Sequence, residues 1–138
     1  MFMVMEINTL LTTLLTPLAL TLVRIVCGYL FLLHAFAKLF HKPLIPEFSH
    51  IQRFSLLWFA SILELIGGAL LVVGLFTQPT AFILSGLMAF AYFIGHASQG
   101  HPLHPVMNKG EPAVLNCFIL LLLAATGAGP WSLDALLF

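Results

Sequence analysis

The sequence predicts an all-α integral membrane protein, a four-helix bundle forming one domain over residues 1–138. Two observations predict this fold. Of the residues, 61% are hydrophobic and 7% are charged, whereas soluble domains are roughly half apolar and a quarter charged. Several apolar stretches also approach the length of about 20 helical residues that crosses a bilayer core of about 30 Å. A soluble helical bundle is disfavoured, because its helices would need polar outer faces that these stretches lack.

Transmembrane spans are predicted between the polar and Pro/Gly-rich breaks, at residues 17–38, 55–75, 80–97 and 112–129. Pro17, Pro79 and Pro112 each lie at or just before a predicted start, where the missing N–H of proline costs least. Before the first span, residues 5–15 are predicted to form a short interfacial helix. No repeat or second domain is evident in the sequence.

The connections between the spans differ in length and charge. Residues 39–54 form a long first connection, residues 76–79 a tight turn and residues 98–111 a polar loop. Outside the spans, the basic residues lie on the side of the two long loops: Lys42, Arg53 and Lys109. The positive-inside rule therefore predicts cytoplasmic long loops and exported termini, in a bacterial inner membrane.

Composition also excludes several classes of function. The formal net charge is zero and no basic run occurs, so nucleic acid binding is excluded. Cys27 and Cys117 lie in hydrophobic runs without a C-x-x-C pair, which indicates neither a disulfide framework nor a dithiol site. No metal site is predicted. The bilayer is the expected partner, and a homo-oligomer stays open.

Arg24 and Glu64 fall inside predicted spans, where a charge costs a few kcal/mol unless it faces protein or water. In an antiparallel pair of spans the two residues would be offset along the axis by only about 6 Å. We therefore expect a salt bridge between them. Such a pair is consistent with a functional site, and equally with an ion pair that only fixes the register of the helices.

Helical spacing places further polar groups on shared faces. Arg24 and Lys38 share one face of the first span, and small residues surround Glu64 on the second. Tyr92 and His96 share a face of the third span, and Asn116 lies in the fourth. All six histidines map to the loop side: His34, His41, His50, His96, His101 and His104. This side is predicted to be rich in proton donors and acceptors.

Five motifs in order resemble the DoxX family of small membrane proteins, over about residues 20–135. They are Arg24-Ile-Val-Cys-Gly28 with Leu33-His34-Ala-Phe-Ala-Lys38-Leu39-Phe40, the run Glu64-Leu-Ile-Gly67-Gly68 to Thr77, Ala91-Tyr92-Phe-Ile-Gly-His96, Asn108-Lys-Gly110-Glu111, and Gly127-Ala-Gly129-Pro-Trp131-Ser132-Leu-Asp134. Ala35 replaces a glycine that is common in the family, a change that removes no polar group.

The resemblance implies a membrane oxidoreductase component, related to the small membrane subunit of a thiosulfate:quinone oxidoreductase, with thiol-redox partners in some members. It carries over polar positions that include Asn108. With the helical faces, it gives Glu64, His96 and Glu111 as candidate catalytic groups. The candidate binding residues are Arg24, His34, Lys38, Tyr92, Asn108 and Asn116. A quinone or similar lipid-soluble carrier is the candidate cofactor.

Alternative functions stay open. A non-catalytic membrane partner or assembly factor would use the polar core for stability and its loops to dock a redox protein. A small-molecule transporter would need a larger cavity, and hence an oligomer. Haem ligation by His34 and His96 is disfavoured, because no close-spaced ligand motif accompanies these residues.

Overall fold

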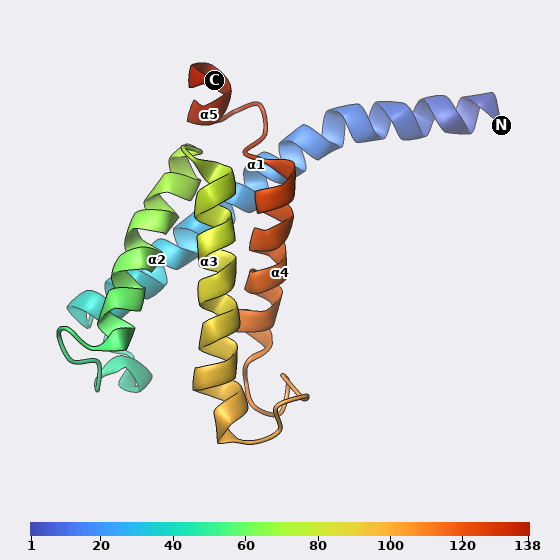
Figure 1. Cartoon of the computed structure of the whole chain (residues 1–138). Coiled ribbons are helices and arrows are strands. Elements are labelled where there is room, and N and C mark those ends of the chain that lie inside the picture. Colours follow the sequence, from blue (N-terminus) through green and yellow to red (C-terminus); the bar gives the residue numbers. More distant parts are fainter.

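The computed structural model describes the backbone of residues 1–138 and every side chain except that of Phe2. Its helices are α1 Phe2–Phe40, α2 Leu56–Val73, α3 Thr77–Ala91, α4 Glu111–Thr126 and α5 Leu133–Leu137 (Figure 1). A π-helical turn, η2 (Tyr92–His96), and a 3-10 turn, η3 (Ala97–Gln99), extend α3, and a 3-10 turn, η1 (Pro46–Phe48), lies in the first loop. The predicted all-α membrane bundle is confirmed.

Helix length supports the membrane assignment. Three helical segments are long and apolar enough to cross a bilayer: Met3–Phe40, Leu56–Val73 and Thr77–Gln99. The fourth, α4, is apolar but only 16 residues long, which corresponds to about 24 Å. The protein is therefore a multi-pass membrane protein whose last main helix is shorter than a typical bilayer core.

The bundle is built from two antiparallel helix pairs. Helix α1 packs mainly on α2, and α3 packs mainly on α4, while α2 and α3 join the pairs. The buried apolar core lies among all four helices and comprises Phe31, Leu71, Ala81, Leu84, Met88, Leu120 and Leu123. Most other large apolar side chains are exposed, as expected for helices whose outer faces contact lipid tails.

Three helix boundaries differ from the ends of the predicted spans. Helix α1 does not begin at Pro17 but runs through it from Phe2, so residues 5–15 form no separate helix. Proline removes one backbone hydrogen bond and bends a helix without ending it when the flanking residues favour helix. Helix α3 begins at Thr77, and α4 ends at Thr126, because the next residue, Gly127, has a φ of 87°.

Helices α1 and α2 cross at two glycines. A Cβ atom on Gly28 would lie 2.7 Å from the carbonyl oxygen of Gly68 and 2.8 Å from the backbone nitrogen of Val72. A Cβ atom on Gly68 would lie 2.9 Å from the Gly28 carbonyl oxygen. The backbones thus touch directly, as small residues allow in membrane helices. This contact sets the register that positions the charged residues of both helices.

Candidate functional site

Arg24 lies on the face of α1 that packs against α2, and only 1% of its surface is exposed. Its Nη1 donates to the carbonyls of Leu71 (2.6 Å) and Val72 (2.8 Å), at the end of α2. Its Nε donates to Ala128 (3.0 Å) and its Nη2 to Trp131 (2.6 Å), between α4 and α5. A cation here bonds carbonyls of the last turn of α2, of which that of Leu71 also accepts from the N–H of Gly74 (3.2 Å), and it opposes the negative end of the helix dipole.

The predicted salt bridge between Arg24 and Glu64 is therefore wrong. The hydrogen bonds of Arg24 go to backbone carbonyls, and Glu64 pairs with Lys38 instead. The crossing at Gly28 and Gly68 places Arg24 about eight residues, or roughly 12 Å, beyond the level of Glu64 along α2.

The direction of the side chains adds to this separation. Every Cα–Cβ bond in a helix tilts toward the N-terminus of that helix. In an antiparallel pair, the side chains of Arg24 and Glu64 consequently lean apart, whereas those of Lys38 and Glu64 lean toward one another. The spacing of residues in the sequence predicts which side chains share a helix face, but not the direction in which each side chain leans along the helix axis.

Asp134 stabilises the same end of the bundle as Arg24, the end where α2 turns into α3. Its carboxylate accepts hydrogen bonds from the backbone N–H groups of Phe76 (2.7 Å) and Thr77 (2.8 Å), at the start of α3. Its own N–H donates to the carbonyl of Gly74 (2.8 Å). Arg24 and Asp134 thus fix the C-terminal segment on the turn between α2 and α3. Asp134 is not among the candidate residues predicted from the sequence, although it is the last residue of the fifth motif.

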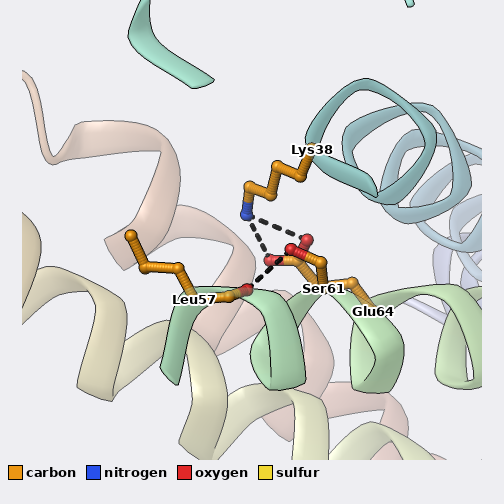
Figure 2. A network of polar contacts seen from close by, with 4 residues as sticks. All are labelled: Lys38, Leu57, Ser61 and Glu64. Carbon is orange, nitrogen blue, oxygen red and sulfur yellow. Dashed lines mark hydrogen bonds and ion pairs between the residues drawn. The ribbon is translucent and has the colours of Figure 1, made fainter. Parts of the chain in front are cut away.

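Lys38 and Glu64 form an ion pair between α1 and α2 in the loop-side half of the bundle, as Figure 2 shows. Lys38 Nζ lies 2.7 Å from Oε1 and 2.9 Å from Oε2 of Glu64. The carboxylate side chain is 4% exposed and the lysine side chain 16%. Next to them, the buried Ser61 donates its hydroxyl to the carbonyl of Leu57 on its own helix (Figure 2). Among the described residues this is the only salt bridge.

His34 and Phe48 lie beside the ion pair. The ring of Phe48, from η1, has its centre 5.5 Å from Lys38 Nζ, within the range of a cation–π contact. The centre of the His34 ring lies 6.2 Å from that of Phe48, and His34 is exposed one helical turn before Lys38. The lysine side of the pair is therefore bordered by an aromatic ring and an exposed imidazole.

Tyr92, His96 and Asn108 form a second polar cluster, in which the third loop is tied to the end of α3. Tyr92 donates its hydroxyl to the carbonyl of Pro102 (2.7 Å) and accepts a hydrogen bond from Asn108 Nδ2 (3.3 Å). His96 Nδ1 lies 3.1 Å from the Asn108 carbonyl oxygen. Asn108 Oδ1 accepts from the N–H of Gly110 (2.9 Å).

The π-helical turn η2 presents Tyr92 and His96 to this loop. Such turns widen a helix locally and are frequent at functional sites. Tyr92 is buried against Gly110, where a Cβ atom would lie 2.6 Å from the tyrosine ring. The glycine of the fourth motif is thus required for the tyrosine to fit. A periodicity of 3.6 residues predicts the shared face but not the π-helical turn.

Glu111 and Asn116 join neither cluster. Glu111 is the exposed first residue of α4, and Asn116 donates its side chain to the carbonyl of Pro112 (2.8 Å) on its own helix. Among the described side chains, no hydrogen bond or ion pair links the group around Glu64 to the group around Tyr92. The structure thus divides the predicted site into separate groups. The roles predicted for these residues stay predictions.

These groups and the bundle define a class: a small multi-pass helical membrane protein with an internal ion pair and a buried arginine. The family model of DoxX matches residues 19–97. An uncharacterised protein from Haemophilus influenzae is 39% identical over 120 residues, which cover 86% of this chain and 90% of that protein. The chain belongs to the DoxX family. No solved structure matches it.

Proposed function

We propose that this protein is the membrane component of an oxidoreductase, and that it binds the headgroup of a quinone beside Lys38 and Glu64. The observation that carries the proposal is the ion pair between two membrane helices, whose lysine side chain is still 16% exposed. Ionisable groups inside membrane segments are costly and mark paths of substrates, ions or protons. The exposed part of the lysine side chain is where a carrier dissolved in the bilayer would approach.

The neighbours of the pair suit a quinone. Its carbonyl oxygens accept hydrogen bonds, and its ring is flat and apolar. Lys38 bonds Glu64 and has a third N–H donor, and the exposed His34 ring one turn away offers another. Phe48 lies close to both Lys38 and His34, so its ring can cover the face of a quinone ring bound there.

Proton transfer is the chemical role proposed for Glu64. A quinone takes up electrons and protons when it is reduced, and a carboxylate beside a lysine can accept and release protons. His34 is exposed one helical turn before Lys38 and is a second group that can exchange protons. On this proposal a redox protein docked on the loops supplies the electrons. Arg24 holds the C-terminal segment in place, and the cluster around Tyr92 holds the third loop. The proposal gives His96 and Glu111 no part in the proton transfer.

A non-catalytic membrane partner that docks a redox enzyme is the second candidate function. The observation that favours it is Arg24, a buried cation that bonds four backbone carbonyls, as a group that stabilises the bundle would. In that case Lys38 and Glu64 would only fix the register of α1 and α2.

Replacing both members of the pair tests the proposed site. The double variant Lys38→Met with Glu64→Leu removes the charges together, so no unpaired charge stays buried and the bundle is expected to fold. We expect the amount of quinone retained per protein to fall at least about tenfold, a loss of roughly 1.4 kcal/mol in binding. The measurement is solvent extraction and chromatography of protein purified in a mild detergent.

The matched control changes the same residue types on the first loop: Lys42→Met with Glu47→Leu, both exposed. It is expected to retain quinone at the wild-type level. A double variant at Lys38 and Glu64 that folds and still retains quinone contradicts the site. Wild-type protein without quinone, purified with one stoichiometric partner that carries the activity, favours the second candidate.

We also propose that the protein lies in a bacterial inner membrane with both long loops in the cytoplasm. The supporting observation is that Lys42, Arg53 and Lys109 are exposed on loops at the same end of the bundle. A periplasm-active reporter fused after Phe138 is expected to be active, and one inserted after Lys109 inactive. The reverse pattern would contradict this orientation.

A further inference from the structure

The first part of α1 leaves the bundle. Every side chain described between residues 3 and 16 is exposed, and Figure 1 shows this segment, in blue, running off to one side. We call residues 3–16 the N-terminal arm. Pro17 follows the arm directly, at the point where the missing N–H of proline weakens the helix and lets it bend.

Two opposite faces run along the arm. Polar side chains recur at helical spacing on one face: Glu6, Asn8, Thr9, Thr12, Thr13 and Thr16. Large apolar side chains occupy the other: Val4, Ile7, Leu10, Leu11, Leu14 and Leu15. A transmembrane segment surrounded by lipid would gain nothing from such a polar face, whereas a helix at the lipid–water boundary requires both faces.

Helix length places the arm outside the hydrocarbon core. The 39 residues of α1 extend over about 58 Å, roughly twice the thickness of that core. Residues 19–38 alone measure about 30 Å and carry every α1 group that bonds or pairs with α2. The N-terminal arm is therefore not needed for α1 to cross the membrane.

The arm lies at the same end of the bundle as α5 and runs across the direction of α3 and α4 rather than along it (Figure 1). Exposed apolar residues also gather at this end, on and beside α5: Trp131, Leu136, Leu137 and Phe138. Indole rings and short apolar helices of this kind are typical of the interfacial region of a membrane.

We propose that the N-terminal arm is an amphipathic anchor that lies in the lipid–water interface on the terminal side, with its apolar face in the acyl chains. Its polar face carries no Lys or Arg, and its one charge is acidic. The anchor therefore binds through apolar burial and requires no anionic lipid. This inference does not depend on the quinone site.

A second copy of the chain suits the arm less well than a lipid surface. The hydroxyls of Thr9, Thr12 and Thr13 donate to carbonyls of their own helix, at 2.7 to 2.9 Å. These donors are already occupied within one chain. The arm also has no basic residue that could pair with Glu6 of another copy. These contacts therefore favour the bilayer surface as the partner of the arm.

The test uses the full chain in vesicles of phosphatidylethanolamine and phosphatidylglycerol. Single cysteines bearing a nitroxide replace Leu11, Leu14, Thr9 or Thr13 in a Cys27→Ala, Cys117→Ala background. Oxygen, which concentrates in lipid, is expected to relax the labels at Leu11 and Leu14 several-fold more than a water-soluble nickel complex does. The labels at Thr9 and Thr13 are expected to show the reverse, and both patterns to persist in pure phosphatidylcholine.

The unlabelled wild-type chain provides a second measurement if the cysteine-free background fails to fold. Met3 lies on the apolar face and Met5 on the polar face, and their exposed fractions without lipid are similar, 71% and 59%. In vesicles, aqueous hydrogen peroxide is expected to oxidise Met5 several-fold faster than Met3. Equal rates would overturn the proposal.

Other label patterns would also overturn it. Depth that increases steadily from Leu14 to Leu11 and beyond would mean that the arm continues the span. Access of the nickel complex to all four positions would mean an arm in water. Spin–spin broadening that disappears on dilution with unlabelled chain would mean pairing of two copies. A pattern that is lost without phosphatidylglycerol would contradict anchoring by apolar burial.

Discussion

Gly28→Ala is expected to destabilise the bundle by about 3 kcal/mol, because the added methyl group meets backbone that cannot move aside. Its Cβ would lie 2.7 Å from the Gly68 carbonyl oxygen and 2.8 Å from the Val72 nitrogen. Helices α1 and α2 would have to separate, and association of membrane helices depends on such close packing. The measurement is the free energy of unfolding in a titration of mild detergent with dodecyl sulfate.

The matched control is Gly86→Ala on α3. Gly86 is exposed, and a Cβ atom there meets nothing within 4 Å. Alanine favours helix over glycine by up to about 1 kcal/mol, so this variant is expected to be neutral or slightly more stable. Gly68→Ala should resemble Gly28→Ala, and the double variant should cost less than the sum, since both changes meet at one contact. Equal stability of the variants at 28 and 86 would contradict the crossing.

The sequence was enough to predict where most of the helices lie and many of the residues that face the core of the bundle. Gly28, Phe31 and Ala35 are buried, and Lys38 is half-buried, as the spacing of one α1 face indicates. Hydrophobic length and proline or glycine breaks identify each membrane helix because a bilayer admits few alternatives. Pro17 shows the limit of such breaks, since a proline that suits a helix start can also lie inside a longer helix.

The partners of the buried charges could not be predicted in the same way. Glu64 and Lys38 were both expected to face inward, but their pairing depends on where two backbones touch and on the tilt of the side chains. Arg24 bonds carbonyls, which every residue has, so no residue type in the sequence marks its acceptors. The π-helical turn at Tyr92 has no periodic signal either. To predict which charges pair between membrane helices, one must know the register of the two helices as well as which residues face inward.

Arg24→Met is expected to cost about 4 kcal/mol and to release the C-terminal segment from the bundle. The variant removes four hydrogen bonds from a charged donor and leaves carbonyls at the end of α2 and between α4 and α5 without that partner. Arg24→Lys keeps the charge but not the planar fork of donors, so we expect it to restore stability only in part. The free energy of unfolding is measured as for Gly28→Ala.

Hydrogen exchange separates local release from general instability. The amides of Phe76, Thr77 and Asp134 are protected by contacts between the C-terminal segment and the turn before α3. In Arg24→Met these amides are expected to exchange at least about tenfold faster, which corresponds to about 1.4 kcal/mol, before the core of α3 opens. Arg53→Met, on the exposed first loop, removes the same charge and should change stability by no more than about 0.5 kcal/mol. Equal behaviour of the variants at 24 and 53 would mean that the guanidinium does not hold this segment, and the buried arginine would then need another role.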